Sequence, residues 1–140
     1  MAEFTAIALT EVAENQNILF TETPVPATKG ILHRAGSGIV RVGGNGSQVR
    51  ARYLVAFSGN IQIPTGGTVG EISLAISIDG EPLASTQMIV TPAAVENLFN
   101  VSAQAYIDVA CGCCAIIAVQ NTSDQAIEVQ NANLIVVRVA

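Results

Sequence analysis

Tryptophan is absent from this 140-residue sequence, and aromatic residues of all kinds make up only 4% of it. Charged residues are also scarce, at 12%, which is about half of their share in an ordinary soluble domain. Half of the residues are nevertheless hydrophobic. A chain this apolar and this poor in charge is expected to bury part of its surface against partner subunits.

Long apolar runs are missing as well, and none approaches the ~18 residues that a membrane span needs, so we expect no membrane insertion. The first residues, Met1–Phe4, lack the basic start and apolar block of a secretory signal. The formal net charge of −5 disfavours nucleic acid and anionic membranes as partners.

Basic residues are few, and most of them fall within one short stretch. These are Arg34, Arg41, Arg50 and Arg52. No glycine-rich phosphate loop or helix N-terminus accompanies them, so salt bridges or solvated strand faces are favoured over an anion site.

Catalytic chemistry has little support. His33 is the only histidine, whereas a metal enzyme built on a jelly roll requires two or three histidines and a carboxylate. No G-x-S-x-G elbow accompanies any serine. Glu71 and Asp79 share the polar face of one expected strand, where solvated carboxylates are ordinary. The sequence therefore predicts no enzyme activity, no cofactor and no metal site.

The three cysteines, Cys111, Cys113 and Cys114, lie in one tight turn. A metal site needs about four ligands, and adjacent residues of an extended chain point to opposite faces, so Cys113 and Cys114 cannot both join one compact site. A metal site shared between chains at a symmetry axis is one alternative. Cys111 and Cys113 are candidates for intermolecular disulfide cross-links. Buried free thiols are the alternative interpretation, above all for Cys114.

Alternation of apolar and polar residues predicts strands along almost the whole chain. In residues 71–79 the even positions are Ile or Leu and are expected to face a core, while the odd positions face a wetter side. Eight or more such segments, about 8–12 residues apart with Gly, Pro and Asn turns between them, predict an all-β sandwich or barrel. We expect a single domain over residues 17–140, preceded by an extended segment over residues 1–16.

The last strand departs from this alternation, because Leu134–Val137 is apolar throughout. One face of a strand in a two-layer sandwich normally meets water, so burial of both faces requires a further layer or another chain. We interpret the second face as a subunit interface. The alternative is a central strand covered by a loop.

Several motifs resemble those of a known family. Ile72–Ile76, followed by the turn Asp79–Leu83, is similar to a hairpin in the jelly-roll domains at the tips of bacterial collagen-like exosporium glycoproteins. The segments Tyr53–Ser58, Val119–Ser123 and Ala132–Val139 resemble the same family in the same order. The resemblance covers the chain from about residue 17 to its end. The sequence lacks the (Gly-X-Y) stalk of the spore proteins, and its CGCC cluster replaces one of their turns.

This resemblance implies a C1q/TNF-like fold, a two-sheet antiparallel jelly-roll sandwich of about 8–10 strands, and assembly into a homotrimer. It places such domains on spores, virions and tail fibres, which implies an extracellular or particle-surface location reached without a signal peptide. The residues expected at the trimer interface are Tyr53, Val55, Phe57, Leu134, Val136 and Arg138.

We therefore expect a non-enzymatic structural or display protein that self-assembles as a homotrimer on a spore, virion or fibre surface. One alternative is a module that binds a glycan or receptor at the tip of the trimer, with Tyr106 as the candidate ligand contact. Another is a filament subunit in which residues 1–17 pair with the sheet edge of a neighbour.

Overall fold

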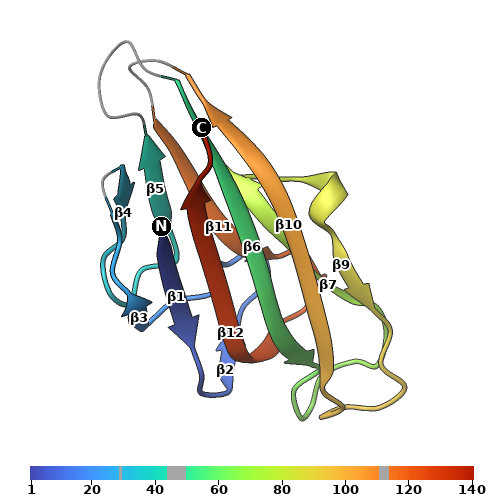
Figure 1. Ribbon diagram of the computed structural model, residues 1–140. Helices are drawn as coiled ribbons and strands as arrows, with labels where there is room; N and C mark the ends of the chain where they lie inside the picture. The colour runs from blue at the N-terminus through green and yellow to red at the C-terminus, as the bar shows by residue number, and fades with distance from the viewer. Residues whose placement is uncertain (29, 44–49, 111–113) are drawn as a thin grey trace.

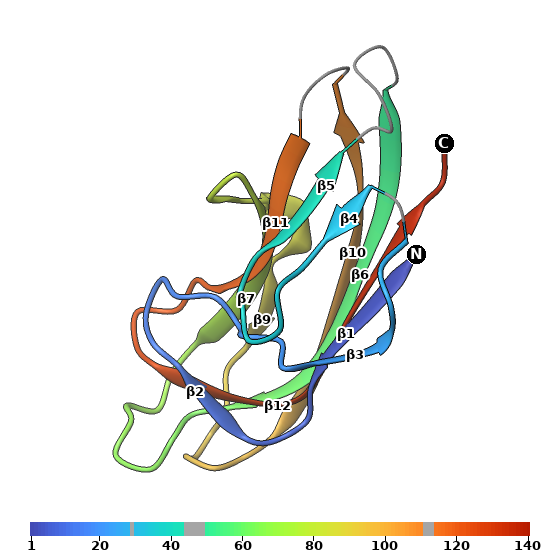
Figure 2. The same ribbon diagram turned by 90° about the vertical axis from the view of Figure 1, so that its left-hand side faces the viewer.

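Two antiparallel β-sheets pack face to face in this protein (Figure 1), and a view turned by 90° shows them as two layers (Figure 2). The computed structural model describes residues 1–28, 30–43, 50–110 and 114–140. In that part of the chain the one helical element is a 3₁₀ turn, η1 (Ala84–Thr86), and no helix there is long and apolar enough to span a membrane.

The front sheet of Figure 1 has the strand order β10–β6–β12–β1–β3, and β2 pairs with the beginning of β12. Its strands are β1 (Ala2–Ala6), β2 (Thr10–Val12), β3 (Glu22–Val25), β6 (Ala51–Gln62), β10 (Phe99–Val109) and β12 (Ile127–Arg138). A bulge between Gln130 and Asn133 bends β12, and Asn131 adopts a φ of 55° there. β12 can therefore pair with β2 before the bulge and with β1 after it.

The back sheet has the order β4–β5–β11–β7–β8, and β9 also pairs with β7. Its strands are β4 (Ile31–Leu32), β5 (Val40–Gly43), β7 (Ile72–Ile78), β8 (Glu81–Pro82), β9 (Met88–Val90) and β11 (Cys114–Asn121). The turn between β7 and β8 has positive φ at both Asp79 (53°) and Gly80 (86°), as a tight two-residue hairpin requires.

The core between the sheets contains most of the aromatic side chains. Phe4, Phe20, Tyr53 and Phe57 are each exposed by 2% or less. The hydroxyl of Tyr53 donates a hydrogen bond to the carbonyl of Gly43, so its polar end is satisfied inside the core. Burial of one such side chain contributes about 1.5–3 kcal/mol, so these four aromatic side chains stabilise the fold.

The odd-numbered face of β7 is drier than its pattern predicts, because Ser73, Ala75 and Ser77 are all buried. Their polar atoms are satisfied within the protein: the Ser73 hydroxyl lies 2.7 Å from that of Thr122, and the Ser77 hydroxyl donates to the Ala118 carbonyl. The expectation of a wetter face is wrong here, since side chains this small are covered by the neighbouring strands and loops.

The N-terminal segment is part of the sandwich. β1 pairs with β12 from Ala2 opposite Val136 to Ala6 opposite Ala132, and it pairs with β3 on its other side. The sequence predicts an extended segment over residues 1–16 outside the domain. The segment is extended, but its first strand is an inner strand of the front sheet, so strand exchange with a neighbour would have to displace these pairings.

Candidate assembly surface and ligand-contact residues

The outward face of the front sheet has a mostly apolar middle. Leu54 and Ala56 on β6 point outward, as do Ile135 and Val137 on the neighbouring β12. Ile135 is 36% exposed, and the other three side chains are partly exposed. A shallow depression beside them is lined by Ala56, Ser58, Ser102, Gln104, Asn133 and Ile135. This set, Leu54, Ala56, Ile135 and Val137, is called the apolar patch below.

The residues expected at the trimer interface lie elsewhere. Tyr53, Val55 and Phe57 face the core, with exposures of 0–2%, and so do Leu134 and Val136 at 0%. Side chains enclosed between the two sheets cannot contact a second chain, so this part of the prediction is corrected. The strands are the expected ones, but the outward side chains are those at alternate positions, because successive residues of a strand point to opposite faces.

Arg138, the sixth residue expected at the interface, is partly exposed at the end of β12. Its Nε donates a hydrogen bond of 3.2 Å to the carbonyl of Ala140. No contact of Arg138 tests its assignment to the interface, which stays a prediction.

Beyond the apolar patch, towards the start of β10 and β12, the same face becomes polar. Asn100 donates to Asn60 over 3.1 Å, and Asn60 donates to Asn131 over 3.2 Å, so three asparagine side chains link β10, β6 and β12. Next to them Gln62 donates to Glu128 over 2.8 Å. These polar side chains therefore hydrogen-bond to one another.

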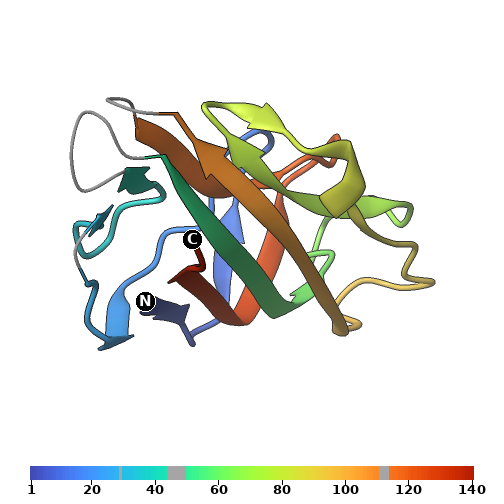
Figure 3. The ribbon, with the colours of Figure 1, turned by 45° about the horizontal axis from the view of Figure 1, so that its top comes forward.

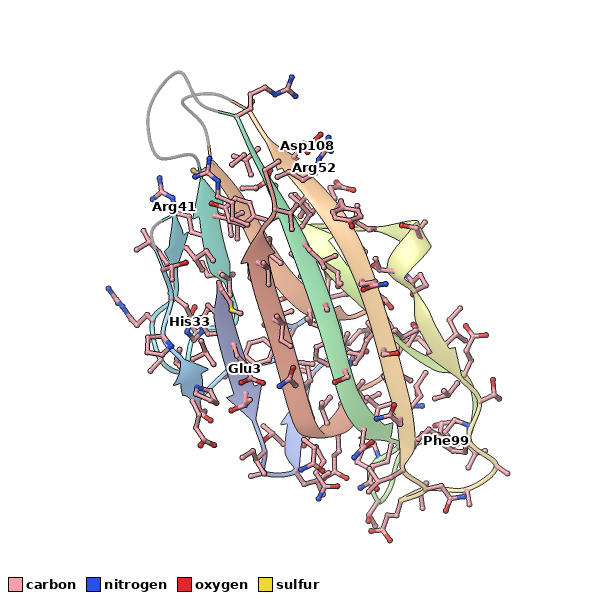
Figure 4. All side chains as sticks on the ribbon, viewed as in Figure 1. Glu3, His33, Arg41, Arg52, Phe99 and Asp108 are labelled. Atoms are coloured by element: carbon pink, nitrogen blue, oxygen red, sulfur yellow. The ribbon has the colours of Figure 1, made fainter. Side chains whose placement is uncertain are left out.

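At the opposite end of the face, an ion pair joins β6 to the edge strand β10 (Figure 4). Arg52 Nε donates to Asp108 Oδ1 over 2.7 Å, and Nη2 donates to Oδ2 over 3.1 Å. The hydrogen bond from Arg52 lowers the pKa of Asp108, and Arg50 lowers it further through its charge. The same pair raises the pKa of Arg52. Arg52 therefore forms a salt bridge, which is the interpretation that the sequence favoured over an anion site.

Tyr106, the expected ligand contact, lies beside this ion pair. Its side chain is 68% exposed, and with Arg52 and Asp108 it lines a depression on the surface. β10 forms one edge of the front sheet (Figure 3), so the depression sits at a corner of the sandwich. Apolar and polar residues alternate over residues 99–109, and this alternation assigns Tyr106 to the polar face of its strand, in agreement with its exposure.

Only one of the three cysteines lies among the residues that the structure describes. Cys111 and Cys113, the candidate cross-linking pair, lie outside the described residues. Cys114 begins β11 and is partly buried. Among the described residues, no group of three His, Cys, Asp or Glu side chains is arranged to hold a metal ion.

His33 is packed against aromatic rings. Its ring centroid lies 4.5 Å from that of Phe4 and 6.5 Å from that of Phe20. Its Nε2 lies 3.0 Å from the carbonyl oxygen of Ser37, which makes Nε2 the donor in this contact. No carboxylate orients the ring among the described contacts, and the structure gives His33 a packing role.

The sequence indicated that one face of Leu134–Val137 meets a partner, but it assigned the wrong alternate residues to that face and so missed the residues of the apolar patch. Leu54 and Ala56 alternate with the core residues of β6, and Ile135 and Val137 alternate with those of β12. The signal was present, because both strands carry apolar residues at consecutive positions. What the sequence did not fix was which of the two sets faces inward.

Solved structures with the same chain path are known, although no protein-family model and no curated protein matches the sequence. Eiger TNF from S. frugiperda superposes with a TM-score of 0.68 at 14% identity, covering 99% of this chain and 91% of that one. The globular domain of zebrafish complement 1qA superposes at 0.58 and 11% identity, covering 96% and 94%. PRD1 vertex protein P5 superposes at 0.50 and 12% identity, covering 99% and 96%.

Structural likeness at sequence identities this low shows the fold alone. The chain forms two antiparallel sheets and crosses from one to the other several times. It superposes on these structures over nearly the full length of each chain, in agreement with the fold that the motifs imply. This protein has the C1q/TNF-like jelly-roll fold.

Proposed function

We propose that this protein is a non-enzymatic structural or display module that self-assembles as a homotrimer through the outward face of its front sheet. The observation that carries the proposal is the apolar patch on β6 and β12, where Ile135 alone is 36% exposed. Removing four such partly exposed side chains from water stabilises an interface by about 2–4 kcal/mol per subunit, at roughly 25 cal/mol per Å².

The edge of the same sheet supports the proposal. β10 is eleven residues long and carries a single charged side chain, Asp108, which is paired with Arg52. Natural proteins protect long exposed edge strands with charges, prolines, bulges or a covering element. β10 has few of these protective features, and a second copy packed against it would cover this edge.

The proposed number of subunits and the proposed location are each supported by a separate resemblance. The motifs shared with the tips of collagen-like exosporium glycoproteins imply three copies about one axis. A vertex protein, PRD1 P5, shares the fold, which supports placement on the surface of a particle. We propose the same kind of location for this chain.

The test compares two isoleucines of equal exposure on opposite sheets. Ile135 on the front sheet is 36% exposed, and Ile116 on the back sheet is 37% exposed. We expect the I135K variant to lose assembly, because lysine would bury an unpaired charge in the interface. We expect the I116K variant to keep the wild-type mass, as measured by light scattering coupled to size exclusion.

Two results would count against the proposed surface. If I135K retained the mass of the wild type, the apolar patch would not be the interface. If I116K dissociated as readily as I135K, the back sheet would be involved as well, and the front-sheet assignment would be wrong.

A further inference from the structure

We propose that a hollow at one end of the back sheet is a binding site for a neutral saccharide. Its volume is about 450 Å³, and it is lined by residues 68–71 of the β6–β7 loop, Ser73 of β7 and residues 122–125 of the β11–β12 loop. Both loops lie at the lower left of the sandwich in Figure 2. A hollow of this volume falls within the range of small-molecule sites.

The hollow lies outside the surface that the proposed homotrimer buries. None of the described residues that line it belongs to β6, β10 or β12. The Ser73 side chain points outward from the back sheet, because its neighbours Ile72 and Leu74 face the core. A ligand can therefore enter the hollow in the assembled protein as well as in a single subunit.

Hydrogen bonds hold the walls of the hollow in place. The Gln125 side chain accepts from the Thr68 N–H over 2.9 Å and donates to the Thr68 carbonyl over 2.7 Å, which ties the two loops together. The Ser123 hydroxyl accepts from the Ser73 N–H over 2.8 Å and donates to the Ser73 carbonyl over 3.1 Å, which ties the second loop to β7. Walls that are ordered before a ligand arrives reduce the cost of binding it.

The two loops present carboxylates to the hollow. Glu71 and Asp124 are both exposed, and within the described residues neither carboxylate takes part in a hydrogen bond or an ion pair. A carboxylate accepts several hydrogen bonds and donates none, so these groups suit a ligand that carries several O–H donors. Adjacent hydroxyls of a sugar ring supply such donors, and hydrogen bonds to a charged acceptor are among the stronger ones.

The wall between the carboxylates combines polar acceptors with apolar surface. The Thr122 hydroxyl donates to the Gln87 side chain over 3.1 Å, so in its 2.7 Å contact with the Ser73 hydroxyl Thr122 is the acceptor. Both protons are thus used within the protein, and the oxygens have lone pairs left for ligand donors. Val69, which is 50% exposed, offers apolar surface for the C–H groups of a sugar ring.

The charge of the hollow selects against acidic ligands. Both of its ionisable residues are acids, and none of the described residues that line it is basic. A ligand carboxylate or phosphate would meet like charges and find no cation to pair with. A metal ion fits less well than a sugar, because no group of three His, Cys, Asp or Glu side chains in the described ranges is arranged to hold one.

The test uses two matched pairs of probes: methyl glucoside with methyl glucuronide, and methyl galactoside with methyl galacturonide. Each is titrated into the wild-type protein by isothermal calorimetry or ligand-observed NMR. We expect the neutral member of at least one pair to bind about tenfold more tightly than its acidic counterpart, and this preference should shrink as salt is raised. Calcium chloride and methylammonium, added as competitors at the same ionic strength, should not displace the sugar.

Variants then locate the binding. D124A and E71A should each weaken binding of the neutral sugar by about tenfold, because each removes a charged acceptor. E71Q should narrow the preference for the neutral sugar over the acidic one. The matched control is E81A, which removes an exposed carboxylate at the start of β8, outside the hollow. E81A should bind like the wild type.

The proposal is overturned if no neutral sugar binds, if the neutral and acidic members of both pairs bind equally, or if calcium or methylammonium displaces the sugar. It is also overturned if D124A and E71A, with wild-type urea denaturation curves, bind like E81A. Binding measured on the I135K variant separates this result from the assembly proposal. A dissociated I135K variant that still binds the sugar supports the site whatever the number of subunits.

Discussion

Asn121 at the end of β11 gives the sharpest stability prediction, because every polar atom of its side chain has a partner although none of the side chain is exposed. Its Nδ2 donates to the carbonyls of Val12 (3.0 Å), Gln125 (3.0 Å) and Ala13 (3.3 Å). Its Oδ1 accepts from the backbone N–H of Ser123 (2.9 Å). One side chain thus joins the β2 region to the β11–β12 loop.

The magnitude follows from the groups that would lose a partner. In an N121A variant the Ser123 N–H is left in a buried site and the Gln125 carbonyl in a partly buried one, and each unsatisfied buried group costs about 1–3 kcal/mol. We expect N121A to lower the free energy of unfolding by about 3–5 kcal/mol, a large part of the ~5–15 kcal/mol of a typical domain. The N121D variant should lose more at neutral pH, because its carboxylate would face three carbonyl oxygens.

The assay is urea denaturation followed by circular dichroism at one fixed protein concentration, since assembly couples stability to concentration. The matched control is D124A, which alters an exposed side chain of the same loop and should change stability by no more than ~0.5 kcal/mol. The N121D deficit should also shrink as the pH falls, because a protonated carboxyl can donate one hydrogen bond. A loss below ~1 kcal/mol for N121A would refute the reasoning.

Two further predictions follow from single contacts. NMR titration should place the Asp108 pKa below the usual value near 3.9, and R52Q should bring it back up. Because the folded-state pKa is the lower one, the stability from this ion pair is present above the unfolded-state pKa and disappears as the pH falls through the folded-state pKa. T86V should cost about 1–3 kcal/mol in denaturation, because the Thr86 hydroxyl accepts from the Ile76 N–H over 3.0 Å in the gap between β8 and β9; T86S should restore most of it.

The strand pattern of the sequence was sufficient to predict the fold class. Alternation over residues 71–79 and 99–109 and the Asp79-Gly80 turn correspond to β7, β10 and the β7–β8 hairpin. Period-two alternation reports on strands because it follows from backbone geometry alone. Which face of a strand is covered depends on the rest of the chain, and there the predictions were less successful.

Two sets of residues illustrate this limit. The consecutive apolar residues Leu134–Val137 predicted that a partner covers the second face of the strand, and this stays a prediction, but Leu134 was assigned to the interface although it lies in the core. Asn121 belongs to a cluster that is typical of an exposed turn, yet it is fully buried. Its partners Val12 and Ala13 are more than a hundred residues away, so no local pattern could have revealed its role.

The corner at Tyr106 could be predicted only in part. The polar face of residues 99–109 placed Tyr106 outward, and the arginine stretch singled out Arg50 and Arg52. The ladder between β6 and β10 brings Arg52 and Asp108 together across 56 positions of sequence. That pairing is a property of the sheet, and it required the structure.

The central claim is that this protein is a homotrimer assembled through the outward face of its front sheet. The most direct measurement is the solution mass by light scattering coupled to size exclusion, with and without reductant. The account predicts about three times the 14.5 kDa subunit mass for the wild type in both conditions, and the subunit mass for I135K. A wild-type protein that elutes with the mass of one subunit would contradict it.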